Sequence, residues 1–83
     1  MGDVKMITAE QIRAARGALG WSAHELAQQA GVGHRTIVRI EATNGVPLGR
    51  VSTLLEVKAA LEAAGIEFVG SPDDRPGIRI GRK

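Results

Sequence analysis

Apolar residues recur at helical spacing in several stretches of the chain. In the first stretch they stand at positions i, i+3 and i+7, as Ile12, Ala15 and Leu19. Thr8 and Gln11 lie three residues apart just before this stripe and have the pattern of a capping box, which marks the start of a helix. The pattern therefore predicts a first helix over about residues 9–19 with one apolar side.

Two further helices are predicted close together after the first. Ser22 and Glu25 repeat the capping-box pattern, so a second helix begins near residue 23. Gly31 ends this helix, because glycine adopts the positive φ of a tight corner at little cost. A third helix follows over about residues 34–42, with Ile37 and Ile40 on its inner side. The short connection indicates that these two helices meet at a steep angle.

A fourth helix and a hairpin complete the predicted elements. Apolar residues at i, i+3, i+7 and i+10 indicate a helix over about residues 50–64, after a loop that contains an Asn-Gly pair and a proline. Two short alternating segments, 66–69 and 77–80, flank a run dense in glycine, proline and aspartate. This arrangement predicts a hairpin with a flexible tip at residues 70–76.

The hairpin must pack against something, because a lone two-stranded hairpin is marginal in water. Three arrangements fit the sequence. We favour a sheet shared with the same hairpin of a second copy; the alternatives are packing on the chain's own helices and a mostly disordered tail. We therefore expect a domain over residues 1–65 and a C-terminal extension over residues 66–83, which is a possible dimerisation element.

Composition describes an ordinary globular domain with an aliphatic core. The chain has 83 residues, of which 43% are hydrophobic and 24% charged, and its aromatic residues are Trp21 and Phe68. A domain of this size buries only about 60% of its unfolded surface, so association with a second copy would help to stabilise it. The absence of cysteine fits a reducing compartment. The sequence shows neither an apolar signal region nor a membrane-spanning run, so we expect a cytoplasmic protein that does not enter membranes.

The charge balance is nearly neutral. The chain carries 11 basic and 9 acidic residues, for a formal net charge of +2. Any nucleic-acid binding must therefore depend on the placement of a few arginines and not on a general positive field. There is no glycine-rich loop for phosphate, and His24 and His34 lack the sequence spacing of a zinc site or a catalytic triad. We expect no enzyme activity, no metal and no cofactor.

The corner between the second and third helices resembles that of a known family. A small residue is followed four positions later by glycine, and branched apolar residues stand five, ten and thirteen positions after the small one: Ala27, Gly31, Val32, Ile37 and Ile40. This set resembles the helix-turn-helix of the Xre/Cro and phage-repressor family of DNA-binding proteins. The resemblance covers about residues 8–64. It implies an all-α, four- to five-helix repressor-like domain, with the short C-terminal β-hairpin outside the shared core.

The resemblance also implies which residues meet double-stranded DNA. In the family, the second helix of the motif enters the major groove, and its first residues face the bases. The corresponding residues here are His34, Arg35, Thr36 and Arg39, and weaker phosphate candidates follow at Thr43 and Asn44. The spacing agrees independently, because positions 35 and 39 are neighbours on the side opposite Ile37 and Ile40. The resemblance further implies a structural ion pair between Arg16 and Glu41.

Each DNA-facing candidate has an alternative role. Arg35 can donate two hydrogen bonds to guanine, or it can be a solvated arginine. Arg39 can reach a base or a phosphate, or it can pair with a nearby carboxylate. His34 can donate to a base edge or a phosphate, or to neither, and Thr36 can contact a thymine methyl group or phosphate, or bond back to its own helix.

The sequence therefore predicts a sequence-specific transcriptional regulator, namely a dimeric repressor of a palindromic operator. The alternative is a protein-binding antiactivator or antitoxin-like module that masks a partner regulator. Two departures from the family motivate this alternative. Ala23 stands where relatives often have a glutamine that touches phosphate, and Gly33 stands where relatives often have a serine or threonine cap.

Overall fold

The computed structural model describes residues 6–81, so the predicted domain limits at residues 1–5 and 82–83 lie outside the described residues. Four helices are followed by a two-stranded antiparallel hairpin. The helices are α1 (Ala9–Leu19), α2 (Ala23–Ala30), α3 (His34–Glu41) and α4 (Val51–Ala63), and the strands are β1 (Ile66–Ser71) and β2 (Asp74–Ile80). The described chain is thus mostly helical, and the prediction of an all-α class is too strict.

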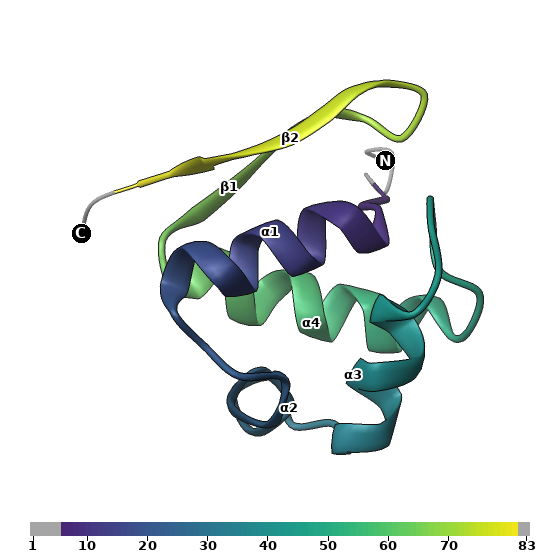
Figure 1. The fold of residues 1–83 in the computed structure, drawn as a ribbon, viewed down its shortest axis with the longest axis vertical. Helices are drawn as coiled ribbons and strands as arrows, with labels where there is room; N and C mark the ends of the chain where they lie inside the picture. The colour runs from purple at the N-terminus through teal and green to yellow at the C-terminus, as the bar shows by residue number, and fades with distance from the viewer. Residues whose placement is uncertain (1–5, 82–83) are drawn as a thin grey trace.

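The helices enclose one aliphatic core. Figure 1 shows α1 and α4 at the centre of the molecule, with α2 and α3 on one side of them and the hairpin on the opposite side. The largest fully buried side chains come from all four helices and are Ile12, Leu26, Ile37, Val57 and Leu61. The apolar stripes that the sequence shows are therefore the surfaces that bring the helices together.

The helix starts form as the capping patterns predict for α1 and α2. The Thr8 hydroxyl accepts from the backbone N–H of Gln11 at 3.1 Å, and the Ser22 hydroxyl accepts from that of Glu25 at 3.0 Å. The side chains of Gln11 and Glu25 accept in return from the backbone N–H groups of Thr8 and Ser22. In contrast, α3 begins after Gly33 without any side-chain cap. Its first turn is the least supported of the three.

The hairpin packs on the chain's own helices. Ile66 and Phe68 of β1 are buried, and Phe68 lies opposite Ile78 of β2. The side-chain amide of Gln11 donates to the carbonyl oxygens of Val69 at 3.2 Å and Gly77 at 2.8 Å, which joins both strands to α1. The alternative of a mostly disordered tail is therefore wrong. Pairing with a second copy remains a prediction.

The predicted tip over residues 70–76 is too long. The strands continue to Ser71 and begin again at Asp74, so that only Pro72 and Asp73 form the turn. Gly70 makes the continuation possible, because its φ of 75° brings its α-carbon close to the backbone of Arg75. A Cβ at position 70 would lie 2.2 Å from the Arg75 carbonyl oxygen, so no other residue fits there.

The loop between α3 and α4 is attached to the start of α1. The backbone N–H of Ala9 donates to the Gly45 carbonyl at 2.8 Å, and the backbone N–H of Gly45 donates to the Glu10 carboxylate at 2.9 Å. This second bond lowers the pKa of Glu10 below its ordinary value, because it stabilises the ionised carboxylate. Hydrogen bonds to α1 therefore fix the position of this loop, which follows α3.

Candidate nucleic-acid interface

A fixed corner joins α2 to α3. Gly31 has a φ of 71°, and the backbone N–H of the next residue, Val32, returns to the Ala27 carbonyl at 3.0 Å. Ala27 is 3% exposed, and Ile37 and Ile40 of α3 are buried against the rest of the core. The small side chain lets the helices approach, and the branched side chains determine how α3 lies across the bundle. The orientation of α3 is therefore fixed, and with it the side of the helix that faces away from the core.

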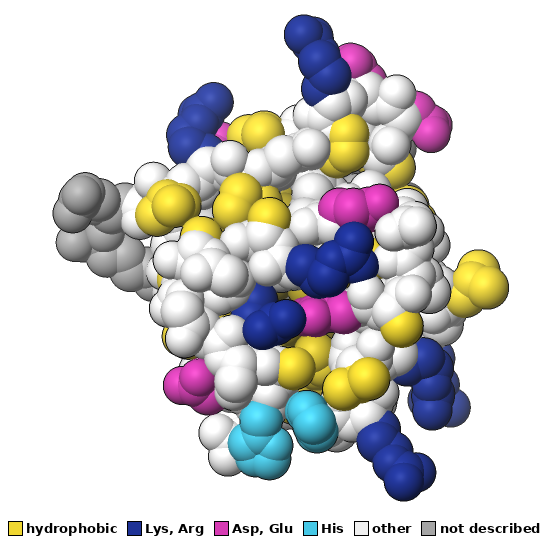
Figure 2. Space-filling model, in the orientation of Figure 1, with side chains coloured by type: hydrophobic (Ala, Val, Ile, Leu, Met, Phe, Trp, Pro, Cys, Tyr) yellow, Lys and Arg dark blue, Asp and Glu magenta, His cyan; other side chains and the backbone are white. Residues whose placement is uncertain are grey.

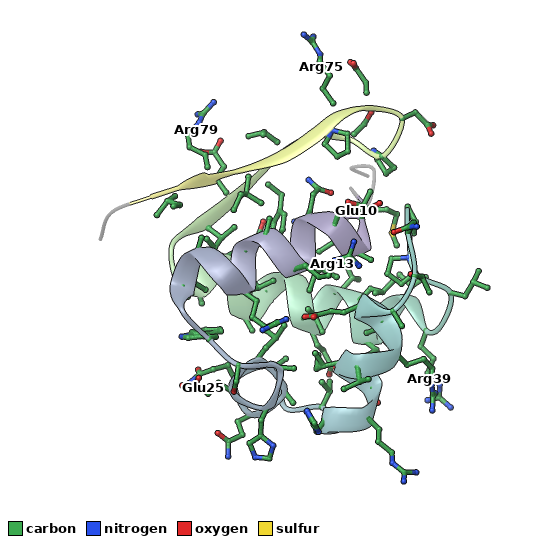
Figure 3. The ribbon with its side chains drawn as sticks, viewed as in Figure 1. Glu10, Arg13, Glu25, Arg39, Arg75 and Arg79 are labelled. Carbon is green, nitrogen blue, oxygen red and sulfur yellow. The ribbon has the colours of Figure 1, made fainter. Side chains whose placement is uncertain are left out.

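This outer side carries two guanidinium groups that have no partner within residues 6–81. His34, Arg35 and Arg39 are exposed, and Thr36 is half-buried. Within residues 6–81, neither Arg35 nor Arg39 makes an ion pair or hydrogen bond, so the alternative of a carboxylate partner for Arg39 is not realised there. Figure 3 shows Arg39 directed away from the bundle. Both guanidinium groups are available to a ligand.

A groove runs between α3 and the start of α4. It has a volume of about 400 Å³, and its apolar lining comes from Ile40, Leu48 and Leu54. Its polar lining comes from Thr36 and Arg39 on one side and from Arg50 and Thr53 on the other. Two arginines from different elements therefore flank a hollow that lies beside the outer side of α3.

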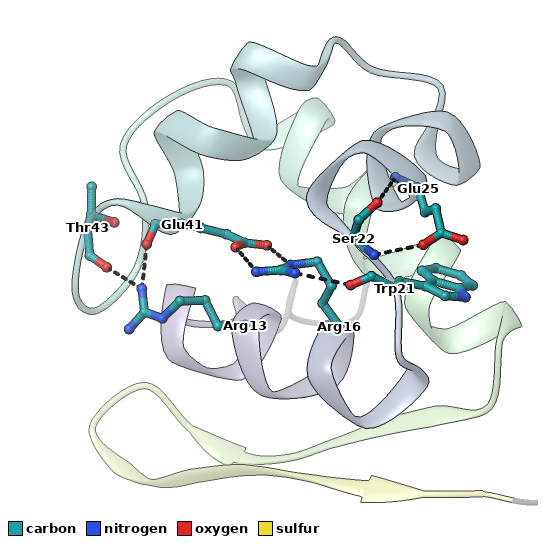
Figure 4. A network of polar contacts seen from close by, with 7 residues as sticks. All are labelled: Arg13, Arg16, Trp21, Ser22, Glu25, Glu41 and Thr43. Atoms are coloured by element: carbon teal, nitrogen blue, oxygen red, sulfur yellow. Dashed lines mark hydrogen bonds and ion pairs between the residues drawn. The ribbon is translucent and has the colours of Figure 1, made fainter.

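The C-terminal end of α3 is fixed to α1 (Figure 4). Arg16 donates from Nε and Nη2 to the two carboxylate oxygens of Glu41, each at 2.9 Å, and from Nη1 to the Trp21 carbonyl at 3.1 Å. These bonds to Glu41 raise the pKa of Arg16, because the carboxylate stabilises the guanidinium. Arg13 donates to the carbonyl oxygens of Glu41 and Thr43, so a second cation sits where the helix dipole is negative.

A helix-turn-helix family model matches residues 12–57, which is more than half of the chain. The chain belongs to the Xre/Cro-type helix-turn-helix family. Membership of this family indicates a DNA-binding transcription regulator. No curated protein matches the chain.

The helix-turn-helix places the predicted DNA-facing residues in two groups. His34, Arg35, Thr36 and Arg39 all lie on α3, the second helix of the motif. Thr43 and Asn44 lie beyond its end, and the Thr43 hydroxyl already donates to the Ile40 carbonyl at 3.2 Å. Asn44 is exposed. The structure therefore brings the first group together on one helix but places Thr43 and Asn44 apart from it.

Sequence reasoning missed three residues around this helix-turn-helix. Val38 is 50% exposed on the outer side of α3, and its position, i+4 from His34 and i+3 from Arg35, could have revealed it. Arg50 precedes α4 and lines the groove, but no sequence pattern marks it. Arg13 supports the end of α3 through backbone carbonyl groups, which have no signature in a sequence.

The described helices can be compared with the length and apolar character of a membrane-spanning helix. None of them has the length and apolar character that crossing a bilayer requires.

Proposed function

We propose that this helix-turn-helix protein is a dimeric repressor that inserts α3 into the major groove of a palindromic operator in the cytoplasm. The observation that carries the proposal is the outer side of α3, where Arg35 and Arg39 are exposed and have no partner within residues 6–81. Occlusion of a promoter by the bound dimer would then repress transcription.

Base reading would come from the segment of α3 between His34 and Val38. Arg35 is near the helix start and can donate two bonds to O6 and N7 of guanine, which is worth about 1–3 kcal/mol of discrimination against another base. Val38 is the apolar neighbour of Arg35 on the same side and suits the methyl group of thymine. His34 and Thr36 flank them with one polar group each. The predicted half-site therefore contains a guanine close to a thymine.

Phosphate contacts would come from the groove side of α3. Arg39 and Arg50 line this groove with the hydroxyl groups of Thr36 and Thr53, and α4 begins there without an acidic residue in its first turn. Each phosphate that a protein cation neutralises makes binding weaker at higher salt, because counterions are released from DNA. The slope of the logarithm of affinity against the logarithm of salt concentration therefore measures how many phosphates the protein neutralises.

Two surfaces are candidates for the dimer interface. The hairpin presents strand edges and Ile80, which is 63% exposed. The end of the loop before α4 and the first turns of α4 present Leu48, Val51 and Leu55, which are 90%, 51% and 39% exposed. A twofold dimer on DNA needs its recognition helices about 34 Å apart and facing the same side. The hairpin lies on the side of the bundle away from α2 and α3, whereas the second surface adjoins α3 (Figure 1).

The test is a titration of the protein against its own upstream DNA at two salt concentrations, with unrelated DNA as competitor. Submicromolar binding that resists the competitor and weakens with salt would support a DNA-reading regulator. Affinity no better than for the competitor would contradict it. Sedimentation of the Leu55→Glu and Ile80→Glu variants would then show which surface holds the dimer, because only one of them should become monomeric.

A protein-binding module is the second candidate. Ala23 offers no polar group at the start of α2, and α3 has no side-chain cap at Gly33, so two of the family's usual phosphate contacts are missing. The partner would then be another regulator, masked by α4 and the hairpin. Recovery of a stoichiometric protein partner, together with the absence of salt-sensitive DNA affinity, would favour this function.

A further inference from the structure

The two histidines of the chain contact each other at the surface. His24 belongs to α2 and His34 to α3, and the turn between the helices brings them together across ten positions of sequence. Their ring centroids are 5.3 Å apart, and the ring planes are inclined by 59°. Figure 2 shows the pair in cyan, side by side at one end of the molecule. The ten-residue spacing of the two histidines matches no sequence motif, but the fold brings their rings into contact.

Both imidazole rings are open to solvent. His24 and His34 are exposed, and within residues 6–81 neither makes a hydrogen bond or an ion pair. Since each neutral imidazole has one nitrogen with a free lone pair, the pair offers two such nitrogens on adjacent rings. Both residues are exposed, so a ligand from solvent can approach the two rings.

The separation of the rings is short enough for both to bind one tetrahedral ion. Zinc binds a histidine nitrogen at about 2.0–2.1 Å, and the ring centre lies about 1.1 Å further along the bond, so two rings at a tetrahedral angle have centres about 5.2 Å apart. An octahedral right angle would require about 4.5 Å by the same construction. The observed 5.3 Å is compatible with the tetrahedral value, and it also lies within the range of about 4.5–7 Å for ordinary ring contacts, so the distance permits shared binding of one ion.

We propose that His24 and His34 form a two-histidine site for a divalent transition-metal ion such as zinc. Imidazole suits zinc, copper and nickel, whereas magnesium and calcium prefer oxygen ligands. No group of three His, Cys, Asp or Glu side chains is placed to hold a metal within the described residues. The pair therefore supplies two ligands and leaves the other positions to water or to an oxygen of a second molecule.

The surroundings make this an exchangeable site. His24 and His34 stand at the starts of α2 and α3, where the helix dipoles are positive and disfavour a cation. Arg35 adds a further positive charge beside His34, and the nearby Glu25 carboxylate is engaged by the Ser22 backbone N–H. A bound ion would join the starts of the two helices and add positive charge next to Arg35. It would leave again when the metal concentration falls.

The test uses zinc chloride alone with the full chain, prepared without a histidine tag and in the absence of DNA. Calorimetry should give one ion per chain, and the ring proton signals of His24 and His34 should shift together in NMR spectra. The variants His24→Ala and His34→Ala should each weaken binding at least about tenfold, because each removes one of two ligands. Gln28→Ala, an exposed change on α2, should leave binding unchanged.

Two results would overturn the site. One is the absence of saturable binding up to millimolar zinc, which would leave the pair as a ring contact of the kind seen between aromatic side chains. The other is zinc affinity that is unchanged in either histidine variant. Because no DNA is present, neither result depends on the proposed repressor function.

Discussion

Arg16 and Glu41 form a two-pronged ion pair in which both carboxylate oxygens are bound at 2.9 Å. The Glu41 side chain is only 9% exposed, and the Arg16 side chain is 26% exposed. The pair therefore joins α1 to the end of α3 in a place that water reaches poorly. Removing one partner leaves the other charged group without compensation.

We expect Arg16→Ala to lower the free energy of unfolding by about 1–3 kcal/mol, because a nearly buried carboxylate loses its charged donors. Arg16→Lys should recover only part of this loss, since an ammonium group cannot reproduce the paired geometry. Urea unfolding followed by circular dichroism gives both values. Arg79→Ala is the matched control: its pair with Glu67 is exposed and 3.4 Å long, so its effect should stay below about 1 kcal/mol. Equal losses in the two alanine variants would contradict this account.

Gln11→Glu should detach the hairpin from α1 while the start of α1 is retained. Glutamate still accepts from the Thr8 backbone N–H, but it has no N–H to donate to the Val69 and Gly77 carbonyl groups. We expect a loss of about 1–3 kcal/mol and faster amide exchange in β1 and β2. Hydrogen exchange followed by NMR resolves this residue by residue.

Glu25→Gln is the control for this experiment. It makes the reverse change in the other capping box, whose side chain is exposed and bonds only to the Ser22 backbone. Its effect should be within about 0.5 kcal/mol and should leave hairpin exchange unaltered. Unchanged hairpin exchange in Gln11→Glu would argue against the role of the amide.

Arg35→Ala should reduce specific affinity for the operator by about 1–3 kcal/mol and relax the preference at one base pair. Arg35→Lys should keep the salt dependence but still lose the preference, because lysine supplies charge without the paired donors. Competition binding against operators that vary at each position measures both effects. Arg75→Ala, on the hairpin at the far end of the molecule from α3, should change neither (Figure 3). Loss of affinity without any change in preference would make Arg35 a phosphate contact.

Gly33→Ser should stabilise the protein by about 0.5–1 kcal/mol. Position 33 has a φ of −72° and a ψ of 148°, which serine adopts readily, and an added Cβ would meet only the Thr36 hydroxyl at 3.8 Å. The serine hydroxyl would cap α3, and the unfolded chain would lose freedom. Gly33→Ala should gain only the part that comes from the reduced freedom of the unfolded chain, because alanine has no hydroxyl group to cap α3. Gly31→Ala should destabilise instead, because its φ is 71°; thermal melts that rank these three variants otherwise would contradict the capping argument.

Glu10 should make stability depend on pH below its ordinary pKa of 4.5. Its pKa is lowered in the folded state by the Gly45 backbone N–H, so the ionised carboxylate favours folding. That contribution is fully present above pH 4.5 and is lost as the pH falls through the lower folded-state value. Urea midpoints between about pH 6 and pH 3 should fall less steeply in Glu10→Gln than in the natural chain. If the urea midpoints of the two proteins fell equally steeply with pH, the hydrogen bond from Gly45 would not favour the ionised form of Glu10.

The local features of the fold could be predicted from the sequence. Both capping boxes and the corner at Gly31 depend on residues within four positions of each other, so their chemistry is legible in the chain itself. The four helices follow from the apolar spacing for the same reason. The corner set, together with the family resemblance, gave the helix-turn-helix and its recognition helix.

Long-range and backbone contacts could not be predicted. Gln11 looked like a capping residue only, and its contacts with Val69 and Gly77 cross 58 and 66 positions of sequence. Arg13 binds carbonyl groups, which every residue has. The hairpin tip was misjudged because turn formers such as Gly70 can also extend a strand pair when one of them accepts a positive φ. The meeting of His24 and His34 is likewise a product of the fold.

The unequal support of the two ends of α3 has a consequence for how a DNA complex would form. Arg13 and Arg16 immobilise the end at Glu41, whereas the end at His34 has no side-chain cap. We therefore expect the first turn to be the part of α3 with the lowest opening free energy. The residues proposed to read bases would lose conformational entropy on binding, and this cost would be smallest on the operator that orders them best. Selectivity would thus arise partly from the ordering of one helical turn.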